Sequence, residues 1–148
     1  MLKRVIAFVD GENLVCRYQD MCSAGRTPLP SVIHERDCFV WSPGMTLWTD
    51  MDLIRVSYYT SVVGDANRVA MVERQISTTM FRSQARSEGV GYSGNAKIIP
   101  RVHKKDSSSR KSKVVDVEIT MDVMRAALQM PVDGIFLLTG DGDYLPLL

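Results

Sequence analysis

The sequence is short of cysteine, of long apolar runs and of net charge, and each shortage excludes a class of protein. Its 3 cysteines show no CxxC spacing. They fit neither a disulfide framework nor a cysteine zinc site and favour a reducing, cytoplasmic compartment. No apolar run approaches the roughly 20 residues of a membrane helix, and the first residues are too weakly apolar for a secretory signal. With 18 Lys and Arg against 17 Asp and Glu, the total charge gives no case for a nucleic-acid partner.

What the sequence does contain is an alternation of strand-like and helix-like segments within a length of 148 residues, enough for one domain. This alternation predicts an α/β fold with a central, mostly parallel sheet. We expect strands over 3–9, 53–60, 96–102 and 132–139, and helices over 13–21, 67–88 and 114–129. Because Pro100 cannot donate a ladder hydrogen bond, we expect the third of these strands to lie at a sheet edge or to end early.

Two segments depart from the alternation inside this single domain of residues 1–148. Residues 23–50 contain proline and glycine and no clear period, so they are interpreted as an irregular insertion. Residues 102–113 are rich in serine and basic side chains, which is typical of a mobile loop.

Four aspartates lie where such a fold would bring them together. Asp10 ends the first strand, and Asp141 and Asp143 follow the last strand within TGDGD. Asp116 lies in the first turn of the helix that leads into that last strand. Ligands of parallel sheets bind outside the carboxyl ends of the strands. If the first and last strands are neighbours, these carboxylates surround one point.

Clustered carboxylates repel one another, and Mg²⁺ or Mn²⁺ removes that cost because these ions prefer oxygen ligands. An ion held this way can activate a water and neutralise a phosphodiester. Each aspartate also has a simpler interpretation as a turn former, a helix cap or a partner of the helix dipole. Asn13 either caps the first helix or orients a water or phosphate beside Asp10, and Thr139 could position water. Glu12 is expected to face solvent.

The helix over 114–129 is expected to turn one apolar stripe to the core: Val117, Met121, Met124 and Leu128. Asp116 lies beside this stripe and Asp122 on the flank that is expected to be solvated. Periodicity therefore favours Asp116 as a metal ligand and leaves Asp122 as a secondary candidate.

Residues 101–113 carry six Lys and Arg and one Asp, a local charge of +5 that precedes the Asp116 helix. These side chains are candidates for phosphate contacts, or else belong to a solvated loop. The candidates are Arg101, Lys104, Lys105, Arg110, Lys111 and Lys113. Three tyrosines could stack on unpaired bases, although packing is the simpler role for each: Tyr18, Tyr92 and Tyr144.

Three motifs together are similar to the NYN domain family, in the LabA-like branch of the PIN-like metal-dependent nucleases. They are FVDGENL (8–14), KVVDVEITMD (113–122) and LLTGDGDYLPLL (137–148), in the family's order and across nearly the whole chain. The resemblance implies a PIN-like three-layer α/β/α sandwich and a Mg²⁺- or Mn²⁺-dependent ribonuclease site. Carried over by position, the site residues are Asp10, Asn13, Asp116, Asp141 and Asp143, with Asp122 matching the second aspartate of the helix motif.

Family members continue past GDGDY into another helix and strand, so the chain is expected to end before the family's last strand. An exposed sheet edge would then favour a homodimer or a protein partner.

The leading hypothesis is a metal-dependent endoribonuclease-like hydrolase acting on single-stranded or structured RNA, with no membrane association. A non-catalytic RNA-binding or regulatory module is the alternative, and it predicts RNA affinity that survives loss of the acids. A phosphomonoesterase fits less well because it needs a DxD pair, whereas this chain has Asp10-Gly11-Glu12.

Overall fold

A four-stranded parallel sheet forms the centre of the molecule. The computed structural model describes residues 3–47, 50–106 and 113–147. The strands stand in the order β7-β4-β1-β8, and each neighbouring pair runs parallel. Their bounds are β1 (Arg4–Asp10), β4 (Asp52–Val63), β7 (Ile99–Lys105) and β8 (Gly134–Leu138). The expected strands beginning near residues 3, 53 and 132 are confirmed, as is the edge position of Pro100 in β7.

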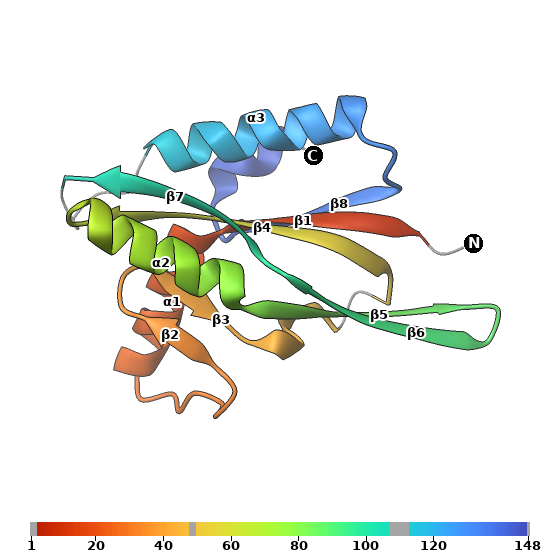
Figure 1. The fold of residues 1–148 in the computed structure, drawn as a ribbon, viewed down its shortest axis with the longest axis horizontal. Helices are drawn as coiled ribbons and strands as arrows, with labels where there is room; N and C mark the ends of the chain where they lie inside the picture. The colour runs from red at the N-terminus through yellow and green to blue at the C-terminus, as the bar shows by residue number, and fades with distance from the viewer. Residues whose placement is uncertain (1–2, 48–49, 107–112, 148) are drawn as a thin grey trace.

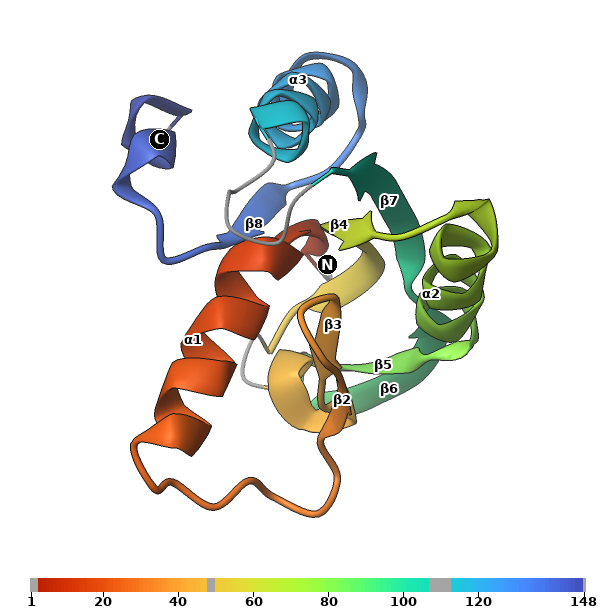
Figure 2. The same ribbon diagram turned by 90° about the vertical axis from the view of Figure 1, so that its left-hand side faces the viewer.

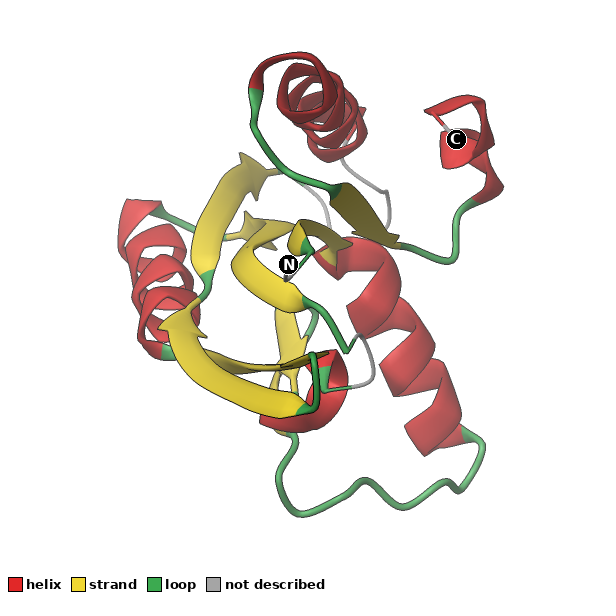
Figure 3. Ribbon diagram, turned by 90° about the vertical axis from the view of Figure 1, so that its right-hand side faces the viewer, coloured by secondary structure: helices red, strands yellow, loops and turns green. Residues whose placement is uncertain are grey.

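Helices cover both faces of this sheet (Figures 1 and 2). Helix α3 (Lys113–Gln129) lies on one face, while α1 (Gly11–Ser23) and α2 (Ala66–Thr78) lie on the other. Figure 3 shows the same arrangement from the opposite side, with the helices in red outside the yellow strands. The predicted three-layer α/β/α architecture is therefore confirmed.

Strand β1 is buried on both faces because it lies between β4 and β8. Val5, Ala7 and Val9 pack on the side of α1 and α2. Ile6 and Phe8 pack on the side of α3. This double burial explains why the segment is apolar throughout instead of alternating with polar residues.

The prediction of one long helix over 67–88 is wrong beyond Thr78. Residues Met80–Ser87 form β5, which pairs antiparallel with β6 (Val90–Lys97). Phe81, Ser83 and Ala85 are buried and alternate with exposed neighbours, which is the period of a strand. The turn between the strands has positive φ at both central residues, 53° at Glu88 and 82° at Gly89. Such values are typical of a two-residue hairpin turn. The expected strand over 96–102 is accordingly divided between β6 and β7.

Residues 23–47 contain more regular structure than the predicted irregular insertion over 23–50. They contain an antiparallel hairpin of β2 (Ile33–Glu35) and β3 (Phe39–Trp41), followed by a short 3-10 helix, η1 (Pro43–Thr46). All three residues of β3 are buried, so the segment adds to the core.

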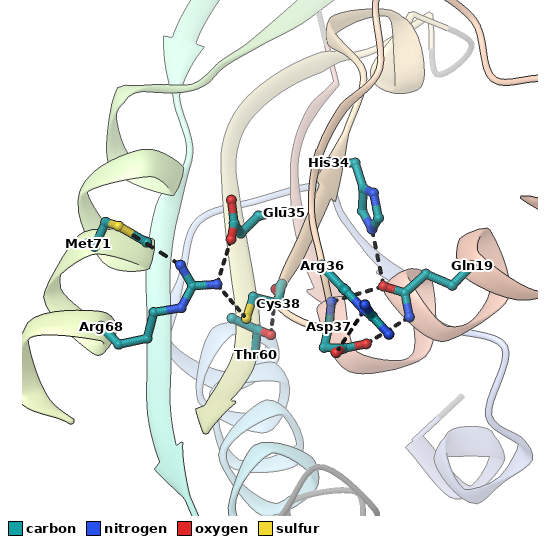
Figure 4. A network of polar contacts seen from close by, with 9 residues as sticks. All are labelled: Gln19, His34, Glu35, Arg36, Asp37, Cys38, Thr60, Arg68 and Met71. Atoms are coloured by element: carbon teal, nitrogen blue, oxygen red, sulfur yellow. Dashed lines mark hydrogen bonds and ion pairs between the residues drawn. The ribbon is translucent and has the colours of Figure 1, made fainter. Parts of the chain in front are cut away.

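Polar side chains tie the β2–β3 hairpin to two helices (Figure 4). From α1, the Gln19 amide contacts the His34 ring at 3.1 Å and donates to the Asp37 carboxylate at 2.9 Å. From α2, the Arg68 guanidinium pairs with Glu35 at 2.5 Å.

The predicted loop over 102–113 begins later than expected, since residues 102–105 belong to β7 and Lys113 opens α3. Residues 107–112, with Arg110 and Lys111, lie outside the described residues.

The predicted core face of α3 is wrong. Val117, Met121, Met124 and Leu128 are between 52% and 81% exposed, and the helix instead buries Val115, Ile119, Val123 and Ala126. The helix carries apolar stripes on two opposite faces, so periodicity alone could not tell which stripe faces the sheet.

Candidate active site

Asp10 lies at the carboxyl end of β1, where the chain turns directly into α1. It is 1% exposed. One carboxylate oxygen caps α1 by accepting from the backbone N–H of Asn13 at 3.0 Å. The other accepts from the Thr139 hydroxyl, which follows β8, at 2.9 Å. Asp10 therefore links the ends of two neighbouring strands, as expected from the adjacency of β1 and β8.

The segment after β8 is fastened to α1 by Asn13. The Asn13 side-chain oxygen accepts from the backbone N–H of Gly140 at 2.9 Å, and Asn13 itself is 6% exposed. A Cβ at Gly140 would lie 2.8 Å from that same oxygen, so the close approach requires glycine. Asn13 thus does not cap α1 with its side chain; it orients the turn that bears the late aspartates.

Hydrogen bonds within this turn fix Asp141 and Asp143. The backbone N–H of Asp141 donates to the Thr139 hydroxyl at 3.1 Å. One Asp141 carboxylate oxygen accepts from the backbone N–H of Asp143, also at 3.1 Å. A continuous chain of contacts therefore runs from Asp10 through Thr139 to the start of the 3-10 helix η2 (Gly142–Leu147).

Tyr144 joins Asp116 to this group. Its hydroxyl donates to the Asp116 carboxylate at 2.8 Å, and the residue is 4% exposed. Burial is the first cause that raises the pKa of Tyr144, followed by this hydrogen bond. The negative charges of three aspartates raise it further: Asp10, Asp116 and Asp141. Carboxylates of β1, α3 and the segment after β8 thus all raise the pKa of one buried phenol hydroxyl. The sequence suggested packing or base stacking for Tyr144, and nothing in it indicated the bond to Asp116.

Asp143 lies at the rim of this group. It is exposed, and together with Asp116 and Tyr144 it lines a cavity of about 230 Å³ between α3 and η2. A small ligand therefore has access to two of the four predicted carboxylates.

The oxygen atoms of this group suit a hard divalent cation, because such ions prefer carboxylate and hydroxyl oxygens as ligands. Within the described residues, however, no group of three or more His, Cys, Asp or Glu is arranged to hold a metal ion. Hydrogen-bond donors already engage both oxygens of Asp10 and one each of Asp116 and Asp141. The side chains fit Mg²⁺ or Mn²⁺ by their chemistry, and binding would replace some of these contacts.

Glu12 is a buried carboxylate, although its position in the sequence predicted exposure to solvent. Its side chain is 6% exposed, accepts from the Ser61 hydroxyl and pairs with Lys105 at 3.1 Å. Lys105 was a candidate phosphate contact, and in the structure its ammonium neutralises Glu12. The position of Glu12 two residues after the end of β1 was the only sequence signal for its burial. Its partners Ser61 and Lys105 are remote in the sequence.

Asp122, the secondary metal candidate, contacts a different set of residues. It accepts from the Tyr59 hydroxyl at 2.7 Å and pairs with Arg125 at 2.6 Å and Arg101 at 3.9 Å. The structure therefore places Asp122 in a contact between α3 and the sheet, and gives Arg101 a carboxylate partner. Of the other basic candidates, Lys104 and Lys113 are exposed.

The structure is that of an α/β domain with carboxylate side chains at the carboxyl ends of its central strands. The sequence profile of the NYN domain matches residues 4–148, so the chain belongs to the NYN domain family. NYN domains belong to the PIN-like nuclease superfamily; they are generally nucleases that use divalent metals and act on RNA. No curated protein and no solved structure matches the chain. None of the described helices is long and apolar enough to cross a membrane.

Proposed function

We propose that this domain is a metal-dependent ribonuclease that hydrolyses RNA phosphodiester bonds. The observation that carries the proposal is a continuous set of contacts among the predicted carboxylates: Thr139 links Asp10 to Asp141, and Tyr144 of the adjoining 3-10 helix donates to Asp116. Within the NYN family, the three sequence motifs favour the LabA-like branch, and three free cysteines favour the cytoplasm.

Asp10, Asp116 and Asp141 would hold Mg²⁺ or Mn²⁺. When bound, the ion would supply a water of lowered pKa and neutralise charge on the phosphodiester. Thr139 and the N–H of Asn13 hold the Asp10 carboxylate in place. Exposed Asp143 serves as a fourth ligand or as the base that takes the proton of the attacking water. Lys104 and Lys113 contact the phosphates of single-stranded or structured RNA.

The test is cleavage of a fluorescently labelled RNA in the presence of Mn²⁺ or Mg²⁺. Asp10→Asn and Asp141→Asn each keep the size of the side chain but remove its charge and replace one acceptor oxygen by an NH₂ donor, and we expect each to lower the rate by about 100-fold or more. Asp20→Asn is the matched control: Asp20 lies exposed on α1, so this variant should cleave at the wild-type rate. Unchanged cleavage in both site variants would refute the proposal.

A non-catalytic RNA-binding role is the second candidate, favoured by the internal hydrogen bonds that engage the carboxylates. It predicts that the wild type binds RNA equally well with EDTA, that Asp10→Asn retains this affinity and that no cleavage occurs with either metal.

A further inference from the structure

A second cavity, of about 670 Å³, lies on the α1 side of the sheet. Its walls come from α1, residues 29–32, β3, η1 and β5. Figure 2 shows α1, β3 and β5 on this side of the sheet. None of the four aspartates of the candidate active site lines it. Its volume is within the range of small-molecule sites, about 300–1,000 Å³. The proposed nuclease activity gives this cavity no role.

Apolar side chains make up most of its wall, among them Leu14, Met21, Leu29 and Met45. Met21 is 56% exposed and Leu29 is 70% exposed, so large apolar side chains stand in water at the cavity. A ligand with an apolar body would remove this surface from water, which is favourable.

One hydrogen-bond donor of the wall lacks an acceptor among the described residues. Trp41 is fully buried, and its indole N–H has no hydrogen-bond partner among the described residues. Buried donors in this state are rare and costly. Two hydroxyls of the wall, those of Ser31 and Ser42, are hydrogen-bonded to each other at 3.2 Å.

The charged residues of the wall are two arginines and no acid. Arg17 and Arg82 are exposed, and across residues 3–47, 50–106 and 113–147 neither guanidinium makes a hydrogen bond or an ion pair. An apolar cavity with two uncompensated guanidinium groups is complementary to an apolar molecule that carries a negative charge.

We propose that this cavity binds an amphipathic carboxylate, an organic acid with an aliphatic body. The body lies among Leu14, Met21 and Met45, and the carboxylate pairs with Arg17 and Arg82. The guanidinium fork matches a carboxylate with two parallel hydrogen bonds, so the charge sets the orientation of the ligand.

Calorimetric titration with dodecanoate, below its micelle concentration, tests the proposal on the whole chain. The comparison ligand is dodecanol, which has the same alkyl chain and no charge. We expect micromolar binding of dodecanoate and, for the Arg17→Ala/Arg82→Ala double variant, a loss of about tenfold or more. Dodecanol should bind wild type and double variant equally.

Arg86→Ala is the matched control, because Arg86 is exposed on the same strand as Arg82 but does not line the cavity. It should bind dodecanoate as the wild type does. Thermal unfolding of each variant checks that exposed arginines were removed without loss of the fold. Absence of dodecanoate binding to the wild type would overturn the proposal, as would equal affinity in the double variant or equal losses for dodecanoate and dodecanol.

Discussion

Replacing Gly11 by alanine should destabilise the domain strongly, although it adds only one methyl group. A Cβ on Gly11 would lie 2.2 Å from Cε1 of Tyr58 and 2.5 Å from the backbone oxygen of Tyr59. Neither neighbour can move easily. Tyr58 is fully buried, packs edge-on against Phe39 and exchanges hydrogen bonds with the backbone of Val40. The oxygen of Tyr59 belongs to β4, a central strand of the sheet.

The expected cost follows from two opposing effects. Inserting a methyl group into a packed core costs about 1–3 kcal/mol, and more where backbone must shift. Alanine is favoured over glycine inside a helix by at most about 1 kcal/mol, and less at its first residue, which Gly11 occupies. We expect a net loss of about 3 kcal/mol in the free energy of unfolding, or about 6–12 °C in Tm for a chain of this size.

Urea unfolding followed by circular dichroism measures this difference, with Gly94→Ala as the control. A Cβ at Gly94, on β6, would meet no atom within 4 Å, so the stability of this variant should change by less than about 0.5 kcal/mol. Because Gly11 directly follows Asp10, the Gly11→Ala variant should also cleave RNA more slowly under conditions in which it is folded. A Gly11→Ala protein as stable as the control would refute the packing described around Tyr58.

Two further predictions concern α3 and its contact with η2. Ile119→Ala should lower the free energy of unfolding by about 2–5 kcal/mol, because Ile119 is fully buried against the sheet. Met121→Ala, at a position 54% exposed, should change it by less than about 0.5 kcal/mol. Equal effects of the two variants in urea unfolding would contradict the observed orientation of the helix. Tyr144→Phe removes the hydroxyl that donates to Asp116 and should strengthen Mn²⁺ binding severalfold in a calorimetric titration; weaker binding would mean that the hydroxyl helps to hold the ion.

The sequence predicted the fold class well because its strongest signals are local. Val5–Val9 is apolar at every position, as a strand buried on both faces must be, and these residues form the centre of β1. The β5–β6 hairpin was missed because 79–88 lacks helix breakers, while its alternation of buried and exposed residues spans only a few positions. The orientation of α3 was missed because Val117 and Ile119 belong to two stripes that are both apolar.

The candidate site was only partly predictable for the same reason. Asp10 ends β1 and Asp141 follows β8, so the rule for parallel sheets was enough to place them near each other. Glu12 and Tyr144 gave no comparable signal. Glu12 pairs with Lys105, 93 residues away, and Tyr144 donates to Asp116, 28 residues away. Contacts at such separations depend on how the layers pack.

By itself, the sequence determined the alternation of strands and helices, the aspartates at the strand ends and the low cysteine content. These features depend on neighbouring residues and on the geometry shared by all parallel sheets. Only the tertiary structure decided which face of α3 is buried, which carboxylates are paired with cations and where the apolar cavity with its two arginines lies. Each of these is set by the packing of segments remote in the chain, where burial and charge compensation depend on neighbours that no local pattern specifies.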